Sequence, residues 1–210
     1  MNDRVLALCE LSNDLLYHRI EKDRLAYYIN ASLEAGFDAA RQYADADLEE
    51  VYCQNDISVV YKEDGKGAFG MAYRGQITLA KDGCSLELFR SSIHALAENS
   101  KNSIFPPLDY EQAKKIHLAH EFFHYLEYRG NRFVSDMLEP VITIQLFGLK
   151  RRAHINRCSE VAAHAFAKAL LRLPVLPNYY DYMYLINTQK MTPEAFEAML
   201  AKYEQELNGN

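Results

Sequence analysis

The feature that most constrains the fold is a pair of histidines four residues apart, His120-Glu121-Phe122-Phe123-His124, inside a segment with helix signals at both ends. Asp109 is a favourable helix N-cap and Gly130 a favourable C-terminal stop, so the sequence predicts a helix between them. Residues i and i+4 lie about 40° apart around a helix axis, so both imidazoles point to one side. The pair therefore predicts a site where one metal ion bridges two side chains of a single helix.

Glu121, directly after the first histidine, predicts the chemistry of that site. Zinc lowers the pKa of a coordinated water molecule towards ~7, and a neighbouring carboxylate can then accept its proton. The hydroxide can attack a carbonyl group that the metal polarises. This His-Glu-x-x-His arrangement on a helix is typical of zinc metalloproteases.

A zinc site of this kind takes a third protein ligand, and the sequence offers several candidates. A metzincin would have glycine three residues and histidine six residues after the second histidine, but Glu127 and Gly130 occupy these positions. The remaining downstream candidates are Asp136, Glu139, His154, Glu160 and His164. Glu160 and His164 stand out because they lie four residues apart on a helical segment that is otherwise largely apolar. An acid on such a face is costly unless it is paired or binds a metal.

The first 55 residues have the spacing of helices. Ser12-Asn13-Asp14 predicts a break between a short first helix and a longer one. Apolar residues from Leu25 to Ala40 follow helical spacing, and Gly36 weakens that helix without ending it. Residues 47–52 predict a further turn or two.

The spacing of apolar residues changes from helical to alternating at Ile57, and the following segment predicts a small, mostly antiparallel sheet. Gly75 predicts a kink or bulge in the second strand. The expected strands cover residues 57–61, 71–80 and 86–89, with turns at 63–67 and 81–83.

The second half of the chain returns to helical spacing. Residues 141–144 fit either a strand or a helix. Residues 156–173 predict a helix that Pro174 ends, and Thr192-Pro193 predicts the start of the last helix. The expected fold class is therefore α+β.

These segments resemble the ImmA/IrrE family of metallopeptidases. The resemblance rests on two stretches, Leu118-Ala119-His120-Glu121-Phe122-Phe123-His124 and Glu160-Val161-Ala162-Ala163-His164-Ala165-Phe166-Ala167 with Leu170-Leu171. It is specific over residues 113–174 and general over the sheet at 57–90. It implies a compact zincin-like (gluzincin-like) domain in which a small sheet packs on the HExxH helix and a Glu-bearing helix.

The resemblance also implies site residues and a role. The implied zinc ligands are His120, His124 and Glu160, with Glu121 as the general base. The implied role is cleavage of a protein, often a transcriptional repressor. Residues 1–55 are expected to form an N-terminal helical segment and residues 56–210 the metallopeptidase domain, in one continuous globular unit.

The sequence departs from the family pattern in three places. His164 stands where the family usually has asparagine or aspartate. The helix ends one residue late, at Leu171-Arg172-Leu173-Pro174. The 35 residues between His124 and Glu160 are long for the family, which indicates an inserted element near the pocket.

Three further histidines have open roles. His164 could hydrogen-bond Glu160, donate to a transition state, bind the metal as a fourth ligand, or simply pack. His117 is expected to pack or to support a ligand, and the alternative is that it binds the metal itself. His154 follows the basic run Lys150-Arg151-Arg152, which is a solvated face or holds a substrate carboxylate. Stabilising an oxyanion needs a donor near the metal, and the candidates are His154, His164, Tyr125, Tyr179 and Tyr180.

Composition limits the partners and the compartment. The net charge of −6 argues against a general binder of nucleic acid or anionic membranes. The N-terminal apolar run is too short for a signal peptide, and no stretch approaches the ~18 apolar residues of a membrane span. The four cysteines are expected to be buried free thiols of a cytoplasmic protein: Cys9, Cys53, Cys84 and Cys158.

The leading hypothesis is a zinc-dependent endopeptidase that acts on a protein partner, such as a transcriptional repressor. The alternative is a non-proteolytic metal-binding or partner-binding regulatory protein on the same scaffold. Four protein ligands around the metal would favour that alternative. A DNA-binding regulator ranks lower, because the chain has no clear helix-turn-helix signal and no basic domain.

Overall fold

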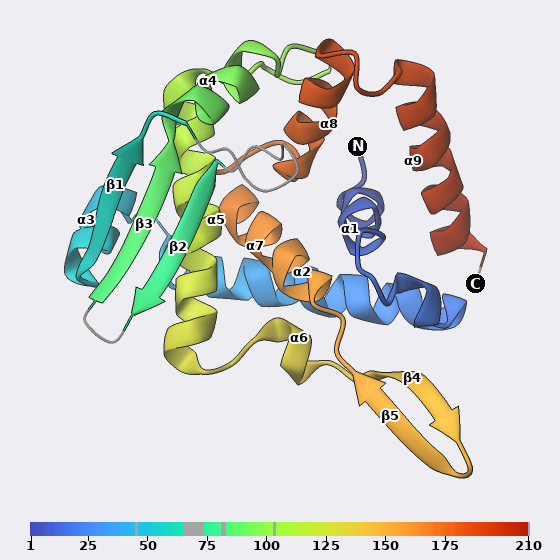
Figure 1. The fold of residues 1–210 in the computed structure, drawn as a ribbon. Helices are drawn as coiled ribbons and strands as arrows, with labels where there is room; N and C mark the ends of the chain where they lie inside the picture. The colour runs from blue at the N-terminus through green and yellow to red at the C-terminus, as the bar shows by residue number, and fades with distance from the viewer. Residues whose placement is uncertain (45, 65–73, 81–82, 103, 210) are drawn as a thin grey trace.

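A computed structural model of the chain shows a mixed α+β protein (Figure 1). The structure describes residues 1–44, 46–64, 74–80, 83–102 and 104–209. The expected loop at 65–67, Met71 and Tyr73 of the expected second strand, and the turn residues 81–82 lie outside the described residues. None of the helices described is long and apolar enough to cross a membrane.

The N-terminal segment is helical as expected. It contains α1 (Asp3–Leu11), two 3₁₀ turns, η1 (Tyr17–Arg19) and η2 (Lys22–Arg24), then α2 (Leu25–Arg41) and α3 (Leu48–Gln54). Asn2 caps α1, and Asp47 caps α3 by accepting hydrogen bonds from two backbone N–H groups. Buried side chains of α1 and α2 belong to the same apolar core as those of the second half of the chain.

The three-stranded sheet comprises β1 (Ile57–Lys62), β2 (Gly75–Ala80) and β3 (Gly83–Phe89), in the order β1-β3-β2. β2 and β3 pair antiparallel as expected, but β1 pairs parallel to β3, so the sheet is mixed rather than mostly antiparallel. Hydrophobic alternation identifies a strand but carries no information about its direction, which explains the wrong prediction. The register of β2 on β3 is regular from its first residue, so Gly75 is no bulge.

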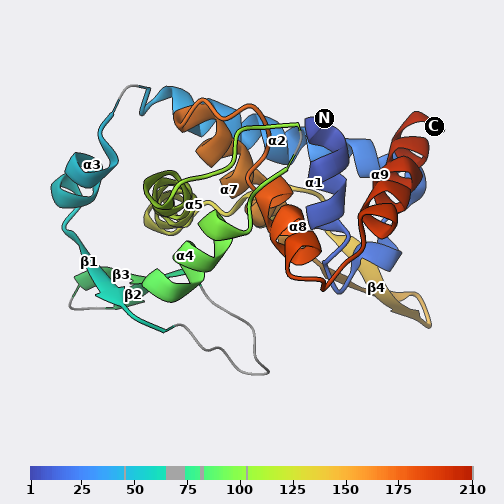
Figure 2. The ribbon, with the colours of Figure 1, turned by 90° about the horizontal axis from the view of Figure 1, so that it is seen from above.

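The central helix α5 (Tyr110–Gly130) lies against the sheet, and α4 (Arg90–Glu98) connects the two (Figure 1). Asp109 and Gln112 form a capping box at its start, and Asn131, in the left-handed conformation, follows its last residue. Seen from above, α3 and the sheet lie on one side of α5, and α1, α8 (Asn178–Asn187) and α9 (Pro193–Asn208) lie on the other (Figure 2). Thr192 caps α9 as expected.

The segment between α5 and α7 (Arg157–Leu170) contains a short helix, α6 (Val134–Met137), and a hairpin. The hairpin strands are β4 (Val141–Leu146) and β5 (Leu149–Ala153), so the ambiguous residues 141–144 form a strand. Figure 1 shows the hairpin projecting away from the rest of the chain.

All four cysteines are free, but not all are buried. Cys9 and Cys158 are buried as expected, whereas Cys53 is exposed and Cys84 is half-buried. The short helix α3 buries Leu48, Val51 and Tyr52, and Cys53 lies outside this buried face.

Helices α2 and α7 approach each other closely at Gly36. A Cβ added to Gly36 would lie 2.1 Å from the carbonyl oxygen of Ala162 and 2.8 Å from the Cβ of Ala165. Only glycine lets the two backbones approach so closely. Alanines along the buried face of α7 allow α5 to pack on it as well, so α7 is held between two helices.

We therefore expect Gly36→Ala to lower the free energy of unfolding by about 1–3 kcal/mol, because the added methyl group meets backbone. This is the opposite of the propensity effect, since alanine is the better helix former. Urea denaturation would measure the change.

Gly130→Ala is the matched control, because a Cβ there meets nothing closer than 4.0 Å. Its stability should stay equal or rise. Equal stability of the Gly36 variant and the wild type would contradict the proposed close contact.

Candidate metal centre

Two histidines of α5 and one glutamate of α7 converge in space. The Nε2 atoms of His120 and His124 are 3.2 Å apart. The Glu160 carboxylate is 3.2 Å from Nε2 of His120 and 3.7 Å from Nε2 of His124. One ligand atom from each of these residues lies within 4.8 Å of the others. Among the described residues, this is the cluster of histidine, cysteine and acidic side chains that could hold a metal ion.

The donor set fits a tetrahedral metal ion. Bonds of 2.0–2.1 Å to zinc place neighbouring ligand atoms roughly 3.4 Å apart, close to the three separations here. Two imidazole Nε2 atoms at 3.2 Å cannot both point a proton at each other, so at least one of them presents a lone pair. Two nitrogens and one carboxylate oxygen form a ligand set found in catalytic zinc sites.

The position of α7 carries Glu160 to the histidines. Asn156 precedes α7 without a side-chain cap, and the Asp14 carboxylate instead accepts a hydrogen bond from the Arg157 backbone N–H at 3.0 Å. The break at the end of α1 therefore caps the helix that holds Glu160. Because Glu160 lies in the first turn of α7, this cap and the contact of α2 set where its carboxylate points.

Glu127, which is not among the predicted site residues, supports His124. Its carboxylate is buried and lies 3.1 Å from Nδ1 of His124. It also accepts hydrogen bonds from the Val134 backbone N–H at 2.8 Å and from the Ser159 hydroxyl at 2.7 Å. A carboxylate that accepts from Nδ1–H leaves Nε2 free to bind a metal. The available signal was a carboxylate three residues after a ligand histidine, on the same helix face.

The cluster has strongly shifted pKa values. Burial acts to lower the pKa of His124, but hydrogen bonds with Glu127 and Glu160 outweigh it and raise the pKa to about 10. Burial acts to raise the pKa of Glu160, but hydrogen bonds from the two histidines hold it far below its usual range. The glutamate is therefore ionised at neutral pH and available as a ligand, whereas a metal ion must displace the proton of His124 in order to bind it.

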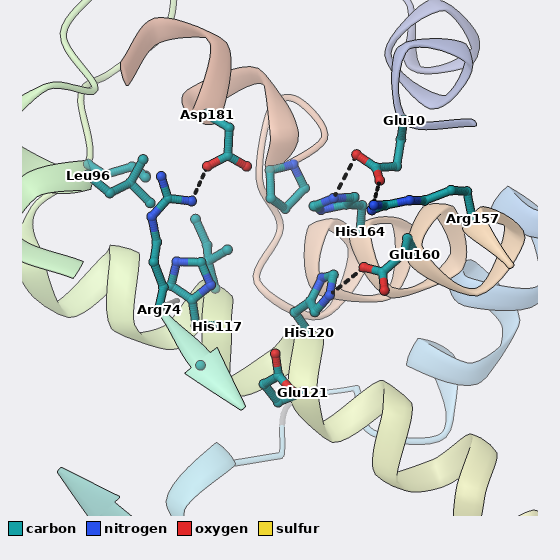
Figure 3. Close-up of a pocket in the computed structure, with 14 residues that line it drawn as sticks. Glu10, Arg74, Leu96, His117, His120, Glu121, Arg157, Glu160, His164 and Asp181 are labelled. Carbon is teal, nitrogen blue, oxygen red and sulfur yellow. Dashed lines mark hydrogen bonds and ion pairs between the residues drawn. The ribbon is translucent and has the colours of Figure 1, made fainter. Parts of the chain in front are cut away.

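His120 and Glu160 of the cluster line a cavity of about 350 Å³ (Figure 3). Glu121 lines this cavity, and its Oε2 accepts a hydrogen bond of 3.1 Å from the Ile77 backbone N–H of β2. Gly75 makes room for it, since a Cβ there would lie 3.1 Å from Cγ of Glu121. The absence of a side chain at Gly75 thus allows a close approach, and the side chain of Glu121 is fixed between α5 and the edge strand β2.

Ion pairs from distant segments close the cavity on two sides (Figure 3). Glu10 of α1 accepts a hydrogen bond of 2.8 Å from Arg157 and lies 3.9 Å from Nε2 of His164. On the opposite side, Arg74 pairs with Asp181 of α8. The tertiary structure brings these four charged residues to the cavity from separate segments, and no local sequence pattern predicts them.

His164 and His117 line the cavity but lie outside the ligand cluster. The ring of His164 is 4.9 Å from that of His120, measured between centroids. Burial and the nearby His120 lower the pKa of His164 to about 3. Burial, followed by the charge of Arg74, lowers the pKa of His117 well below its ordinary value. Both histidines are therefore uncharged at neutral pH.

The other candidates lie elsewhere. Asp136 is exposed, and Glu139 is exposed and pairs with Arg24. His154 contacts the Ser135 carbonyl oxygen at 2.9 Å and lines a neighbouring groove. The tyrosine candidates Tyr125, Tyr179 and Tyr180 are buried in the core and do not line the cavity.

No protein-family model, no curated protein and no solved structure matches this chain. The case for a metal centre therefore rests on the geometry of its residues.

We expect the purified chain to bind close to one zinc ion, and His120→Ala, His124→Ala or Glu160→Ala to abolish tight binding, since each removes one of three ligands. Elemental analysis of protein purified without added zinc would measure the metal per chain. His154→Ala is the matched control and should keep its metal. Wild-type protein that holds no metal and takes none up would refute the site.

We expect Glu127→Gln to weaken zinc binding about 10–100-fold. An amide whose oxygen keeps the Val134 and Ser159 bonds turns its NH₂ group towards Nδ1 of His124, so it no longer accepts that proton. Titration against a chromogenic chelator would measure the affinity, with thermal unfolding as a check of the fold. An unchanged affinity would show that Glu127 does not support the ligand.

Proposed function

We propose that this chain is a zinc-dependent endopeptidase, a compact zincin-like enzyme that cleaves a protein substrate in the cavity beside His120, His124 and Glu160. The observation that carries the proposal is a cluster of three converging ligands, two of which, His120 and Glu160, line the same cavity as a separate carboxylate, Glu121. Three protein ligands leave one position of a tetrahedral ion for water or substrate, as in catalytic zinc sites.

Bound zinc would supply a Lewis acid that polarises the substrate carbonyl and acidifies a water molecule. Glu121 is the group of this chain that takes up the proton. The hydrogen bond from the Ile77 N–H holds its carboxylate at the edge of the sheet, beside the ligand helix. After the attack, the same carboxylic acid can pass the proton to the leaving amine.

His164 is the favoured donor to the developing oxyanion. Of the five candidates from the sequence, it lines the cavity next to a ligand histidine, whereas His154 lines the neighbouring groove. Its Nδ1 is buried without a hydrogen-bond partner. With its pKa lowered to about 3, the ring is neutral and carries one N–H at working pH.

The geometry favours this function over a purely structural metal site. A structural zinc is closed by four protein ligands, but the cluster among the described residues has three, and His164 stands outside it. The substrate we propose is a protein of the cytoplasm, such as a transcriptional repressor. The family resemblance of the two site helices supports this choice, and the net charge of −6 supports a protein partner over nucleic acid or a membrane.

We expect Glu121→Gln to keep its zinc and its fold but to lower kcat about 10²–10⁴-fold, the usual contribution of a general base. Cleavage of a pool of quenched fluorescent peptides by the zinc-loaded chain would measure this. The control is Glu111→Gln, the same change in the exposed first turn of α5. Full activity of Glu121→Gln with bound zinc would rule out the proposed base.

A further inference from the structure

The β4–β5 hairpin lies outside the proposed catalytic machinery and projects from the body of the protein (Figure 1). Among the described residues, its two strands pair only with each other. Each strand therefore has a free outer edge, which can accept an additional strand.

The end of the hairpin is apolar and exposed. Phe147 is 96% exposed and Leu149 79%, with Leu146 at 60% and Ile144 at 55%. These residues contribute nothing to the core, and leaving several large apolar side chains together in water marks a contact surface.

The turn itself is built against local preference. Phe147 has φ of 47° and Gly148 has φ of 81°, so both central residues of the two-residue turn have positive φ. Such turns favour asparagine or glycine at the first position, because a bulky side chain is strained there. Neither turn stability nor solubility accounts for phenylalanine at this position. A contact made by its ring does account for it.

The hairpin also differs in charge from the rest of the protein. Residues 141–153 contain Lys150, Arg151 and Arg152 and no acidic residue, for a net charge of +3. The remainder of the chain has 20 basic and 29 acidic side chains, a net charge of −9. All three basic side chains are exposed, and no ion pair among the described residues involves them. An acidic partner complements this surface.

A groove next to the base of the hairpin extends to one residue of the candidate metal centre. His154, one residue after β5, lines a groove of about 620 Å³ that Arg157 and Glu160 also line. Glu160 is one of the three clustered metal ligands. Leu15, which is 91% exposed, lies on the rim of the same groove. A chain bound along the hairpin can thus continue through the groove to the cluster.

We propose that the β4–β5 hairpin is the docking site for an acidic, apolar segment of the protein substrate, which the adjoining groove leads towards the metal centre. This inference rests on the proposed peptidase function. The net charge of −9 on the rest of the chain disfavours an anionic membrane as the partner. A membrane is broad enough to face the acidic body of the protein as well as the basic hairpin, and the body would be repelled. The groove that ends at Glu160 favours a polypeptide over a second folded copy.

The test measures binding separately from hydrolysis. Three fluorescent peptides serve as probes: an acidic–apolar one of Asp, Glu, Leu and Phe, an acidic–polar one with serine in place of Leu and Phe, and a basic–apolar one with lysine in place of Asp and Glu. Fluorescence anisotropy with the full-length, zinc-loaded Glu121→Gln chain gives their affinities without cleavage. We expect the acidic–apolar peptide to bind tightest, with an affinity that falls as salt is added.

The hairpin variants are Phe147→Asn and Arg151→Glu, each expected to weaken this binding about tenfold. Phe147→Asn creates the Asn-Gly pair that the turn favours, so its melting temperature should stay equal or rise while its affinity falls. The matched controls are Ile104→Asn, also an exposed apolar residue, and Arg41→Glu, an exposed arginine on α2, and both should bind as the parent does.

Equal binding by hairpin variants and controls would overturn the inference, as would a preference for the basic–apolar peptide. Hairpin-dependent sedimentation with phosphatidylserine vesicles, or a hairpin-dependent dimer in analytical ultracentrifugation, would also overturn it in favour of a membrane or a second copy. The two proposals fail differently. Hairpin-dependent peptide binding by a chain that cleaves nothing contradicts the peptidase alone, whereas cleavage of short peptides without hairpin-dependent binding contradicts the docking site alone.

Discussion

The close approach of α2 to α7 at Gly36 is the contact on which the rest of the structure depends. It places the backbone of α7 within reach of a glycine and thereby lets a thin, alanine-rich helix lie between α2 and α5. Glu160 sits at the start of this helix and the two histidines sit on α5. A wider helix at either contact would move the carboxylate away from the imidazoles. The ligand cluster is therefore a consequence of core packing between helices that are far apart in sequence.

The same packing buries or partly buries several carboxylates near the cluster, and each of them has a partner of opposite charge or a hydrogen-bonding partner. His124 lies between two carboxylates, Glu127 on one ring nitrogen and Glu160 near the other. Glu10, whose pKa burial raises, is held by Arg157 across the cavity. Carboxylates in such surroundings are costly unless each has a cationic or hydrogen-bonding partner. A bound dication would add a further partner where Glu160 meets His120 and His124.

Local sequence signals predict much of the fold and part of the site. Helix α5 has its cap, its stop and both histidines within one continuous segment, so spacing alone predicted it. The strand segments were equally visible, but the direction of β1 depends on how the chain crosses the sheet, which alternation does not encode. The role of Glu127 follows from its position three residues after His124 on the same helix, a signal that is present in the sequence. Glu10, Arg74 and Asp181 could not be predicted, because their pairs join segments more than a hundred residues apart.

Several residues are unfavourable for their local secondary structure or environment. For most of them a contact within the described part of the protein explains the choice of residue, but for Phe147 none does. Gly36 is unfavourable in a helix but is required where α7 approaches, and Gly75 is unfavourable in a strand but makes room for Glu121. The buried Glu127 is costly alone but is satisfied by three partners. Phe147 is both strained and exposed, and nothing within the described part of the chain offsets either cost. Since local rules are broken mainly where function requires it, the compensation for Phe147 is expected from a binding partner. The partner we propose meets the basic hairpin, which lies next to the groove that Glu160 lines.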